Sequence, residues 1–294
     1  MLLEQVEYVR PVNIDEALAV LAEVDGAAPL AGGQSLVNVL KNRVASVDLL
    51  VDISRLPELR EIAGTEDGGL EIGACVTYDE LDRAPAIRAG HRVLAEVAAH
   101  IEDQQIRNKG TIGGNCCLSD PTNNLPPILV ALDAVMNLRS RSGKRSIAAL
   151  EFFKGYFATA LEPGELLVSV RVPAMPGGSG AGYASLLVAA DAKAMVRAAA
   201  WVQLSTGGSR IAAARVVLAR VANVPVRDAA VEAQLAGAEA TEAVVRDACA
   251  HAAEGLRPLA DIHGSSEYRR EMAKVMAQRA VIQAIAEARG VQPS

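Results

Sequence analysis

The sequence predicts an α+β protein of two domains, each with a core of its own. Its 294 residues are enough for two domains of ordinary size. Segments with strand-like and helix-like patterns are mixed in both halves of the chain. The stretch richest in glycine and proline, Pro173–Gly182, lies between the halves. Because such stretches interrupt regular structure, we expect the domain boundary there.

Apolar runs and capping patterns place the elements of the first half. Asn13 and Glu16 form a capping-box pattern that opens a helix through about Val24, and Thr77 with Glu80 repeats the pattern. Further helices are expected at Val93–Ile101, after Asn124 where two prolines suit a first turn, and around Phe152, Phe153 and Tyr156. Strands are expected at Pro29–Leu30, Val47–Ile53, Leu70–Ala74, Val135–Leu138 and Glu165–Val172.

The second half has a simpler pattern. Ala194–Leu204 and Ile211–Val221 are apolar segments that we predict to be paired strands. Two helices are expected to follow, at about Thr241–Ala253 and Ser266–Ala288.

Composition excludes several classes of function. The net charge is −6 and basic residues are scattered, which argues against a nucleic-acid or anionic-membrane surface. No run of eighteen apolar residues predicts a membrane span, and the N-terminal segment lacks a signal-peptide pattern, so the cytoplasm is the expected location. The four cysteines and four histidines show no metal-ligand spacing, so we expect free thiols and no metal site in this chain.

Two glycine-rich segments about eighty residues apart carry most of the functional information. The first is AGGQSL, Ala31–Leu36, and the second begins with TIGGN, Thr111–Asn115. Glycines allow the backbone to approach a ligand closely, and successive N–H groups can form an anion-binding nest. The segments match neither a P-loop nor the G-x-G-x-x-G fingerprint. If the two loops meet in space, they would hold the diphosphate of a dinucleotide without a Rossmann fold.

These motifs, followed by SSEYRREMAKVMAQRA at Ser265–Ala280, occur in an order and spacing that resembles the FAD-binding subunit of the molybdenum-containing hydroxylases. The resemblance covers nearly the whole chain. It implies a two-lobed FAD-binding domain of the vanillyl-alcohol-oxidase/PCMH type at residues 1–176, with lobes of about 1–55 and 56–176. It also implies a smaller α+β domain at 183–290, with a three-stranded sheet and a helical bundle.

The resemblance further implies which residues contact FAD. The backbone of both glycine loops would hold the diphosphate, with direct hydrogen bonds from the Ser35 and Thr111 hydroxyls. An acidic residue common after the second loop is replaced here by Asn124, which is either a flavin contact or a helix cap; Asp120 is a nearby substitute. Leu167 packs either near the flavin or in the strand core. The full set is Ala31, Gly32, Gly33, Gln34, Ser35, Leu36, Thr111, Ile112, Gly113, Gly114, Asn115, Asp120, Asn124, Leu167, Tyr183, Ser185 and Asp191.

One segment departs from the family pattern. Tyr183 and Asp191 fit it, but Ser185 stands where lysine is common and Ala192 where an aromatic residue is common. The family pattern puts this segment beside the isoalloxazine, where charge tunes the flavin potential. Our hypothesis is that Lys193 restores the positive charge from a shifted position. We read the adjacent pair Cys116–Cys117 as small buried residues.

The implied function is electron transfer. A large partner would carry the molybdenum cofactor, a small partner would carry [2Fe-2S] clusters, and FAD on this chain would pass electrons to an external acceptor, in a dimer of heterotrimers. No catalytic acid, base or nucleophile is expected here. Two alternatives stay open: a freestanding FAD-dependent reductase or oxidase of the same fold, and a scaffold subunit that has lost FAD.

Overall fold

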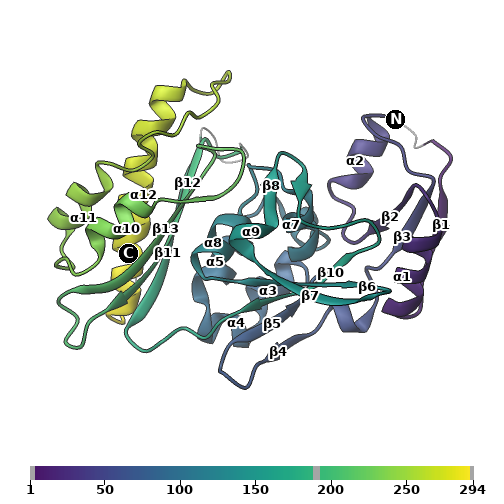
Figure 1. The fold of residues 1–294 in the computed structure, drawn as a ribbon, viewed down its shortest axis with the longest axis horizontal. Coiled ribbons are helices and arrows are strands. Elements are labelled where there is room, and N and C mark those ends of the chain that lie inside the picture. The colour runs from purple at the N-terminus through teal and green to yellow at the C-terminus, as the bar shows by residue number, and fades with distance from the viewer. Residues whose placement is uncertain (1–3, 188–192, 292–294) are drawn as a thin grey trace. The chain divides into compact units, whose positions relative to one another are not determined.

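The computed structural model describes residues 4–187 and 193–291. These residues form two compact units (Figure 1). Unit 1 comprises the described parts of Met1–Ser119 and Ala134–Pro173, and unit 2 those of Asp120–Asp133 and Ala174–Ser294. The segment Asp120–Asp133 therefore belongs to unit 2, although it lies between two segments of unit 1 in the sequence. Nothing in the sequence predicted this grouping.

The first part of unit 1 is a parallel three-stranded sheet with two helices. Its elements are β1 (Glu7–Val9), α1 (Ile14–Glu23), β2 (Ala27–Leu30), α2 (Leu36–Lys41) and β3 (Leu49–Asp52). The strand order is β1-β3-β2, so the central strand β3 is buried throughout its length. At the start of α1 the Asn13 side chain accepts a hydrogen bond from the Glu16 amide at 2.8 Å. The Glu16 carboxylate accepts from the amide of Val12 rather than Asn13, so only half of the predicted capping box is present.

The second part of unit 1 is an antiparallel five-stranded sheet in the order β4-β5-β10-β6-β7, with helices around it. The Thr77–Glu80 capping box that opens α3 is complete. The elements are η1 (Pro57–Leu59), β4 (Ile62–Gly64), β5 (Leu70–Gly73), α3 (Tyr78–Arg83), α4 (Pro85–Gly90), α5 (Arg92–Ala99), α6 (Gln104–Arg107), α7 (Ile112–Leu118), β6 (Val135–Ser140), β7 (Gly143–Ala148), α9 (Ala149–Phe152), β8 (Phe153–Gly155), β9 (Ala158–Thr159) and β10 (Leu166–Val172).

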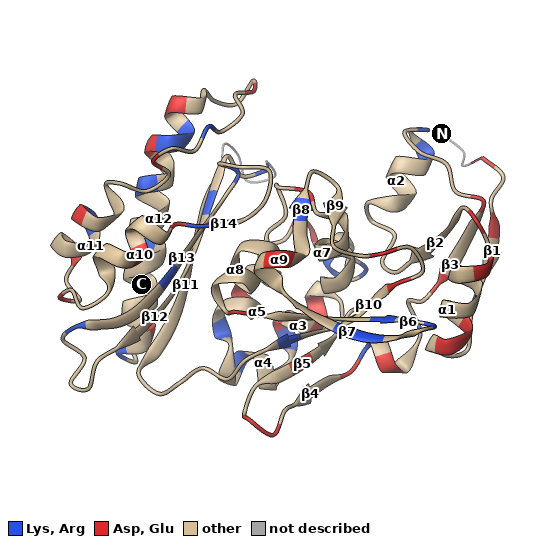
Figure 2. Ribbon diagram, in the orientation of Figure 1, with Lys and Arg blue, Asp and Glu red and all other residues tan. Residues whose placement is uncertain are grey.

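Ion pairs join the two parts of unit 1. Figure 2 shows acidic positions along α1 and basic positions on β6 and β7. Arg139 pairs with Asp15 at 2.5 Å, and Arg141 pairs with Glu23 at 2.6 Å. All but Arg139 are largely exposed, so each pair contributes on the order of 0–1 kcal/mol. The pairs therefore link α1 to the β6–β7 hairpin with little gain in stability.

Unit 2 is an antiparallel sheet covered by helices. Three long strands and a two-residue fourth strand have the order β11-β12-β13-β14. Helix α12 packs closely on β11, because a Cβ atom on Gly180 or Gly182 would lie 2.3 Å or 2.0 Å from helix carbonyl oxygens. The elements are α8 (Leu125–Ala131), β11 (Ser179–Leu186), β12 (Val196–Leu204), β13 (Ile211–Ala219), β14 (Val226–Arg227), α10 (Ala229–Leu235), α11 (Glu242–Cys249) and α12 (Ser266–Ala288).

The fold class is confirmed, and one predicted element is wrong. The helix expected to contain Phe152, Phe153 and Tyr156 ends at Phe152, and Phe153 begins strand β8. From Phe153 the backbone pairs with β9, Phe153 opposite Thr159 and Gly155 opposite Ala158, and glycine disfavours continuation of a helix. Strand β11 was missed, because its glycines, which admit α12, also mark linkers. No helix among the described residues is long and apolar enough to cross a membrane.

Candidate functional site

The first glycine loop connects strand β2 to helix α2 in unit 1. Gly33 has φ +71°, a left-handed conformation that glycine adopts at little cost. A Cβ atom on Gly32 would lie 2.0 Å from the carbonyl oxygen of Lys109 and 3.0 Å from the Cα of Gly110. The first loop therefore lies directly against the residues that lead into the second loop. The condition that the two glycine segments come close in space is met at Gly32 and Gly110.

The backbone amides of the first loop are available to a ligand. Within the described parts of the chain, the N–H groups of residues 32–35 make no hydrogen bond. Most of the loop is half-buried and Ser35 is exposed. Gln34 folds back, and its side-chain amide donates weakly to the Gly32 carbonyl at 3.4 Å. Unused N–H groups around a left-handed glycine have the chemistry of an anion-binding nest.

The second glycine loop is packed tightly against the segment between β5 and α3. A Cβ atom on Gly113 would lie 2.6 Å from both the Cβ and the carbonyl oxygen of Ala74. On Gly110 it would lie 2.5 Å from the ring of Tyr78. The side-chain amide of Asn115 donates to the Tyr78 hydroxyl at 3.0 Å, with both residues buried. These glycines are thus required by protein packing.

The amides of this second loop have protein acceptors. Ile112 donates to Val76 at 3.0 Å, and Gly113 donates to Ala74 at 2.8 Å. The Gly114 amide donates to the Thr111 hydroxyl oxygen at 3.0 Å, which caps helix α7. The Asn115 amide donates to the Thr111 carbonyl. The loop thus offers a ligand the exposed backbone of Gly114 rather than a row of unused donors.

Leu167 also belongs to unit 1. It lies in β10 opposite Leu138 of β6, next to a register shift, and is 3% exposed. This burial agrees with a strand-core role and leaves the proposed flavin contact to be tested.

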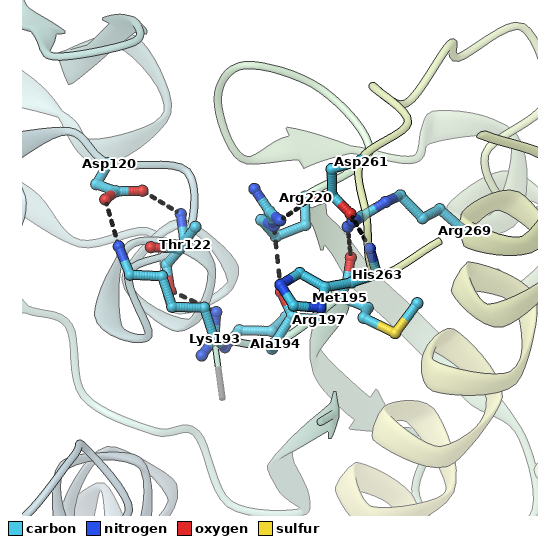
Figure 3. A network of polar contacts seen from close by, with 10 residues as sticks. All are labelled: Asp120, Thr122, Lys193, Ala194, Met195, Arg197, Arg220, Asp261, His263 and Arg269. Carbon is cyan, nitrogen blue, oxygen red and sulfur yellow. Dashed lines mark hydrogen bonds and ion pairs between the residues drawn. The ribbon is translucent and has the colours of Figure 1, made fainter. Parts of the chain in front are cut away.

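Asp120 and Lys193 form an ion pair in unit 2, with 3.1 Å between Nζ and Oδ2 (Figure 3). Burial alone would raise the pKa of Asp120, but hydrogen bonds from Thr122 and Lys193 outweigh it and hold the pKa below its usual range. The positive charge that we expected Lys193 to supply is therefore largely compensated by Asp120.

Asn124 is the N-cap residue directly before helix α8, but its side chain makes no capping hydrogen bond. Its Oδ1 accepts from Arg197 at 3.2 Å, and its carbonyl accepts from the Tyr183 hydroxyl at 3.1 Å. Ser185 lies on β11 directly opposite Arg197 of β12. The structure thus brings Asn124, Tyr183 and Ser185 together around Arg197. Asp191 lies outside the described residues.

Sequence reasoning missed two residues. Arg197 is 3% exposed, and its signal was a single charge inside an apolar strand. Asp52, at the end of β3 beside Leu30, accepts hydrogen bonds from Tyr8, Arg10 and Ser54. Burial would raise its pKa, but these bonds hold it below the usual range. Its signal was an acid ending a buried strand.

The cysteines are free thiols, and three of the four are buried. Burial raises the pKa of Cys75, Cys117 and Cys249 to about 12. Burial also raises the pKa of Cys116, so none of the four is a reactive thiolate at neutral pH. Where the chain is described, no group of three or more His, Cys, Asp or Glu side chains could hold a metal ion.

Two family models match the chain. Residues 4–175 match the FAD binding domain in molybdopterin dehydrogenase, and residues 182–284 match the CO dehydrogenase flavoprotein C-terminal domain. The fold and the paired loops therefore define an FAD-binding flavoprotein. The free amides of residues 32–35, beside a left-handed glycine, fit the diphosphate of that cofactor.

Relatives refine this class. The chain is 36% identical to the glyceraldehyde dehydrogenase medium chain of Sulfolobus acidocaldarius, over 93% of this chain and 96% of the relative. It is 36% identical to the carbon monoxide dehydrogenase medium chain of Afipia carboxidovorans, over 96% and 98%. The crystal structure of quinoline 2-oxidoreductase from Pseudomonas putida 86 superposes with a TM-score of 0.92 at 33% identity, covering 98% of this chain and 99% of that one. The chain belongs to the family of FAD-binding medium subunits of molybdopterin dehydrogenases.

Proposed function

We propose that this chain is the electron-transfer subunit of a molybdopterin dehydrogenase. It would receive electrons from iron–sulfur clusters on a small partner and deliver them to an external acceptor. A large partner with the molybdenum cofactor would oxidise the substrate. We also propose that the complex is a dimer of heterotrimers in the cytoplasm. Within this chain, we propose an FAD-binding domain at residues 1–176 and a second domain at residues 183–290.

The observation that carries the proposal is the pair of loops in unit 1. The first loop has N–H groups without hydrogen bonds to the described residues, and its Gly32 packs against Lys109, which leads into the second loop. A diphosphate needs donors arranged in advance, and a nest held by packing supplies them without a conformational cost. FAD, when bound, supplies the redox chemistry, and the protein supplies position and electrostatic tuning.

Each part of the chain has a separate task in this proposal. The amides of residues 32–35 bind the diphosphate, with Ser35 adding its exposed hydroxyl. The exposed face of Gly114 allows a close approach at the second loop. We propose further FAD contacts from Leu167 in unit 1 and from Asp120, Asn124, Tyr183, Ser185 and Asp191.

The substrate of the complex is not set by this chain. Relatives of similar identity are named for glyceraldehyde, carbon monoxide and quinoline. Because such different substrates accompany similar medium chains, we propose that substrate choice belongs to the large partner.

A visible absorption spectrum of the purified native chain, followed by acid release of the flavin, tests cofactor binding. We expect equimolar FAD. FMN would contradict the dinucleotide role of the loops. No flavin after incubation with excess FAD, in the chain or in its complex, would favour a scaffold subunit.

Affinity purification from the native source, followed by metal analysis, tests the electron-transfer role. We expect molybdenum and iron to co-purify, and substrate to bleach the flavin absorbance only when both partners are present. A chain that purifies alone and whose FAD is reduced directly by NAD(P)H would instead be a freestanding reductase.

A further inference from the structure

Two arginines are almost completely buried in unit 2, and they differ in how their charge is compensated. Arg269 is 1% exposed and pairs with Asp261 at 2.6 Å. It also donates to the carbonyl of Met195 at 2.6 Å (Figure 3). Asp261 pairs in addition with Arg220 at 3.2 Å. The charge of Arg269 is therefore balanced by a carboxylate within the protein.

Arg197 has no such carboxylate among the described residues, although it is only 3% exposed. Its Nη1 donates to the carbonyl of Thr122 and its Nη2 donates to Asn124 Oδ1 at 3.2 Å. Both partners are neutral oxygens. The Nε atom is buried and has no acceptor within the described part of the chain, as is also true of Arg269 Nε, so the absence of a carboxylate is what distinguishes Arg197. Lys193, four residues earlier in the chain, is also a cation and cannot compensate the charge of Arg197. Its own carboxylate partner is Asp120.

A second buried polar atom without a hydrogen-bond partner in the described residues lies on the neighbouring strand β11. Ser185 and Arg197 are direct partners in the antiparallel register of β11 and β12, so their side chains stand on the same face of the sheet. The Ser185 hydroxyl is buried and lacks a partner in the described residues. Tyr183, two residues earlier, is on that face as well. One face of unit 2 thus presents a guanidinium N–H and a hydroxyl that both lack an acceptor.

Such an arrangement is costly unless a ligand completes it. A buried guanidinium without a counter-charge loses several kcal/mol of hydration that neutral carbonyls only partly replace. Buried donors without acceptors are rare in proteins, and each calls for an explanation. An oxygen with negative charge, placed between Nε and Oγ, would satisfy both donors and compensate the charge.

We propose that Arg197 and Ser185 form a binding subsite for an electron-rich oxygen of the flavin ring of FAD. The inference rests on the proposed function, which makes FAD the resident cofactor. The carbonyl oxygens of a flavin ring gain negative charge on reduction. A fixed cation beside them therefore favours the reduced form and raises the midpoint potential.

Binding of FAD and of ADP to the full chain separates this subsite from the glycine loops. ADP carries the diphosphate without a flavin ring. The Arg197→Met variant, measured by titration after flavin removal, should bind FAD about tenfold or more weakly, since a charge-assisted hydrogen bond is lost. Its affinity for ADP should be unchanged. Arg197→Lys keeps the charge and should retain the midpoint potential better than Arg197→Met, even where part of the affinity is lost.

Two matched variants control for loss of positive charge at other places in unit 2. Arg215→Met removes an arginine from the neighbouring strand β13, where it stacks on Trp201 and pairs with Asp133. Arg246→Met removes a largely exposed arginine from helix α11, where its carboxylate partner is Asp247 at 3.8 Å. Both should leave the FAD:ADP affinity ratio close to that of the unaltered chain, and both should shift the flavin midpoint potential less than Arg197→Met does.

Moving the charge across the strands is the sharper test. In Ser185→Lys/Arg197→Met a cation returns from the directly opposite position, so the midpoint potential should recover toward the starting value. The proposal is overturned if folded Arg197→Met keeps the FAD affinity and midpoint potential of the unaltered chain. If Arg197→Met does not fold, equal midpoint potentials and FAD affinities for Arg197→Gln and the unaltered chain overturn it. Failure of the unaltered chain to bind FAD would instead contradict the proposed function.

Discussion

The two glycine loops have similar compositions, but their backbone amides have different partners. In the second loop, the amides of residues 112–115 donate to protein oxygens, and Gly113 sits against Ala74 without room for a Cβ atom. In the first loop, the amides of residues 32–35 have no acceptor among the described residues. The second loop is built into the sheet, whereas the first is held beside it with its donors unused.

This difference separates two reasons for a Gly-Gly pair. A glycine is needed where backbone approaches protein, as at Gly113, or where a loop must take a left-handed conformation, as at Gly33. The first loop contains both situations, at Gly32 and at Gly33, and its amides still make no hydrogen bond to the described residues. Substitutions in the second loop should therefore affect folding first, and those in the first loop should affect FAD binding first.

Gly113→Ala should have the largest effect on stability. The added methyl group would lie 2.6 Å from the Ala74 backbone, which cannot move without disturbing β5, so overpacking should cost about 3 kcal/mol. Urea unfolding measures the loss. Gly143→Ala is the control, because nothing lies within 4 Å of its Cβ position. Equal free energies of unfolding for the two variants would contradict the structural role of the second loop.

Gly32→Ala should act mainly on the cofactor. Its Cβ would lie 2.0 Å from the Lys109 carbonyl, so the loop must move away and misplace its donors. Losing one or two charge-assisted hydrogen bonds should weaken FAD binding about a hundredfold. Isothermal titration with FAD and with ADP should give parallel losses, while the midpoint of urea unfolding falls less than in Gly113→Ala. Unchanged affinity for both ligands would contradict the assignment of the diphosphate to this loop. Gly64→Ala, with open space at its Cβ position, is the control.

The free energy of unfolding should depend on pH through Asp52, the last residue of strand β3. The folded-state pKa of Asp52 is depressed, so its hydrogen bonds stabilise the protein fully above the unfolded pKa, about 3.9. This stabilisation is lost as pH falls through the folded-state pKa. The difference in free energy of unfolding between the unaltered chain and Asp52→Asn should therefore shrink below pH 4. A difference that is independent of pH down to about pH 2 would show that Asp52 has an ordinary pKa.

Thr111→Val should have a smaller effect, confined to stability. It removes the oxygen that accepts from the Gly114 amide at the start of α7, and loss of such a cap costs about 1 kcal/mol. Thr111→Ser keeps the oxygen and is the matched control. If Thr111→Val instead weakens FAD binding as much as Gly32→Ala, the hydroxyl contacts the cofactor directly.

Gln34→Ala should have the smallest effect of the series. Its side chain makes only a weak, 3.4 Å hydrogen bond within the first loop, so stability should change by no more than about 0.5 kcal/mol. FAD affinity should also stay nearly constant, because the donors are backbone groups. A large loss of FAD affinity would show that the Gln34 side chain, rather than the amides, binds the cofactor.

Much of the fold was predictable because it depends on local patterns. Helix α12 begins and ends where its pattern predicts, at Ser266 and Ala288, and the Thr77 capping box is complete. These features rest on side chains within a few residues of one another. Predictions failed where a distant partner decides the structure. The glycines of β11 are explained only by α12, about a hundred residues later, and Phe153 becomes a strand through pairing with β9.

The sequence by itself determined the α+β class, the two glycine loops and, through their order, the resemblance to FAD-binding subunits. Those properties are written in residue types and spacing. Only the tertiary structure decided which loop keeps its amides free, that Asp120 compensates Lys193, and that Arg197 is buried opposite Ser185 without a carboxylate among the described residues. The reason is physical: hydrogen-bond partners and counter-charges are set by approach in space, and a residue's neighbours in the sequence do not specify them.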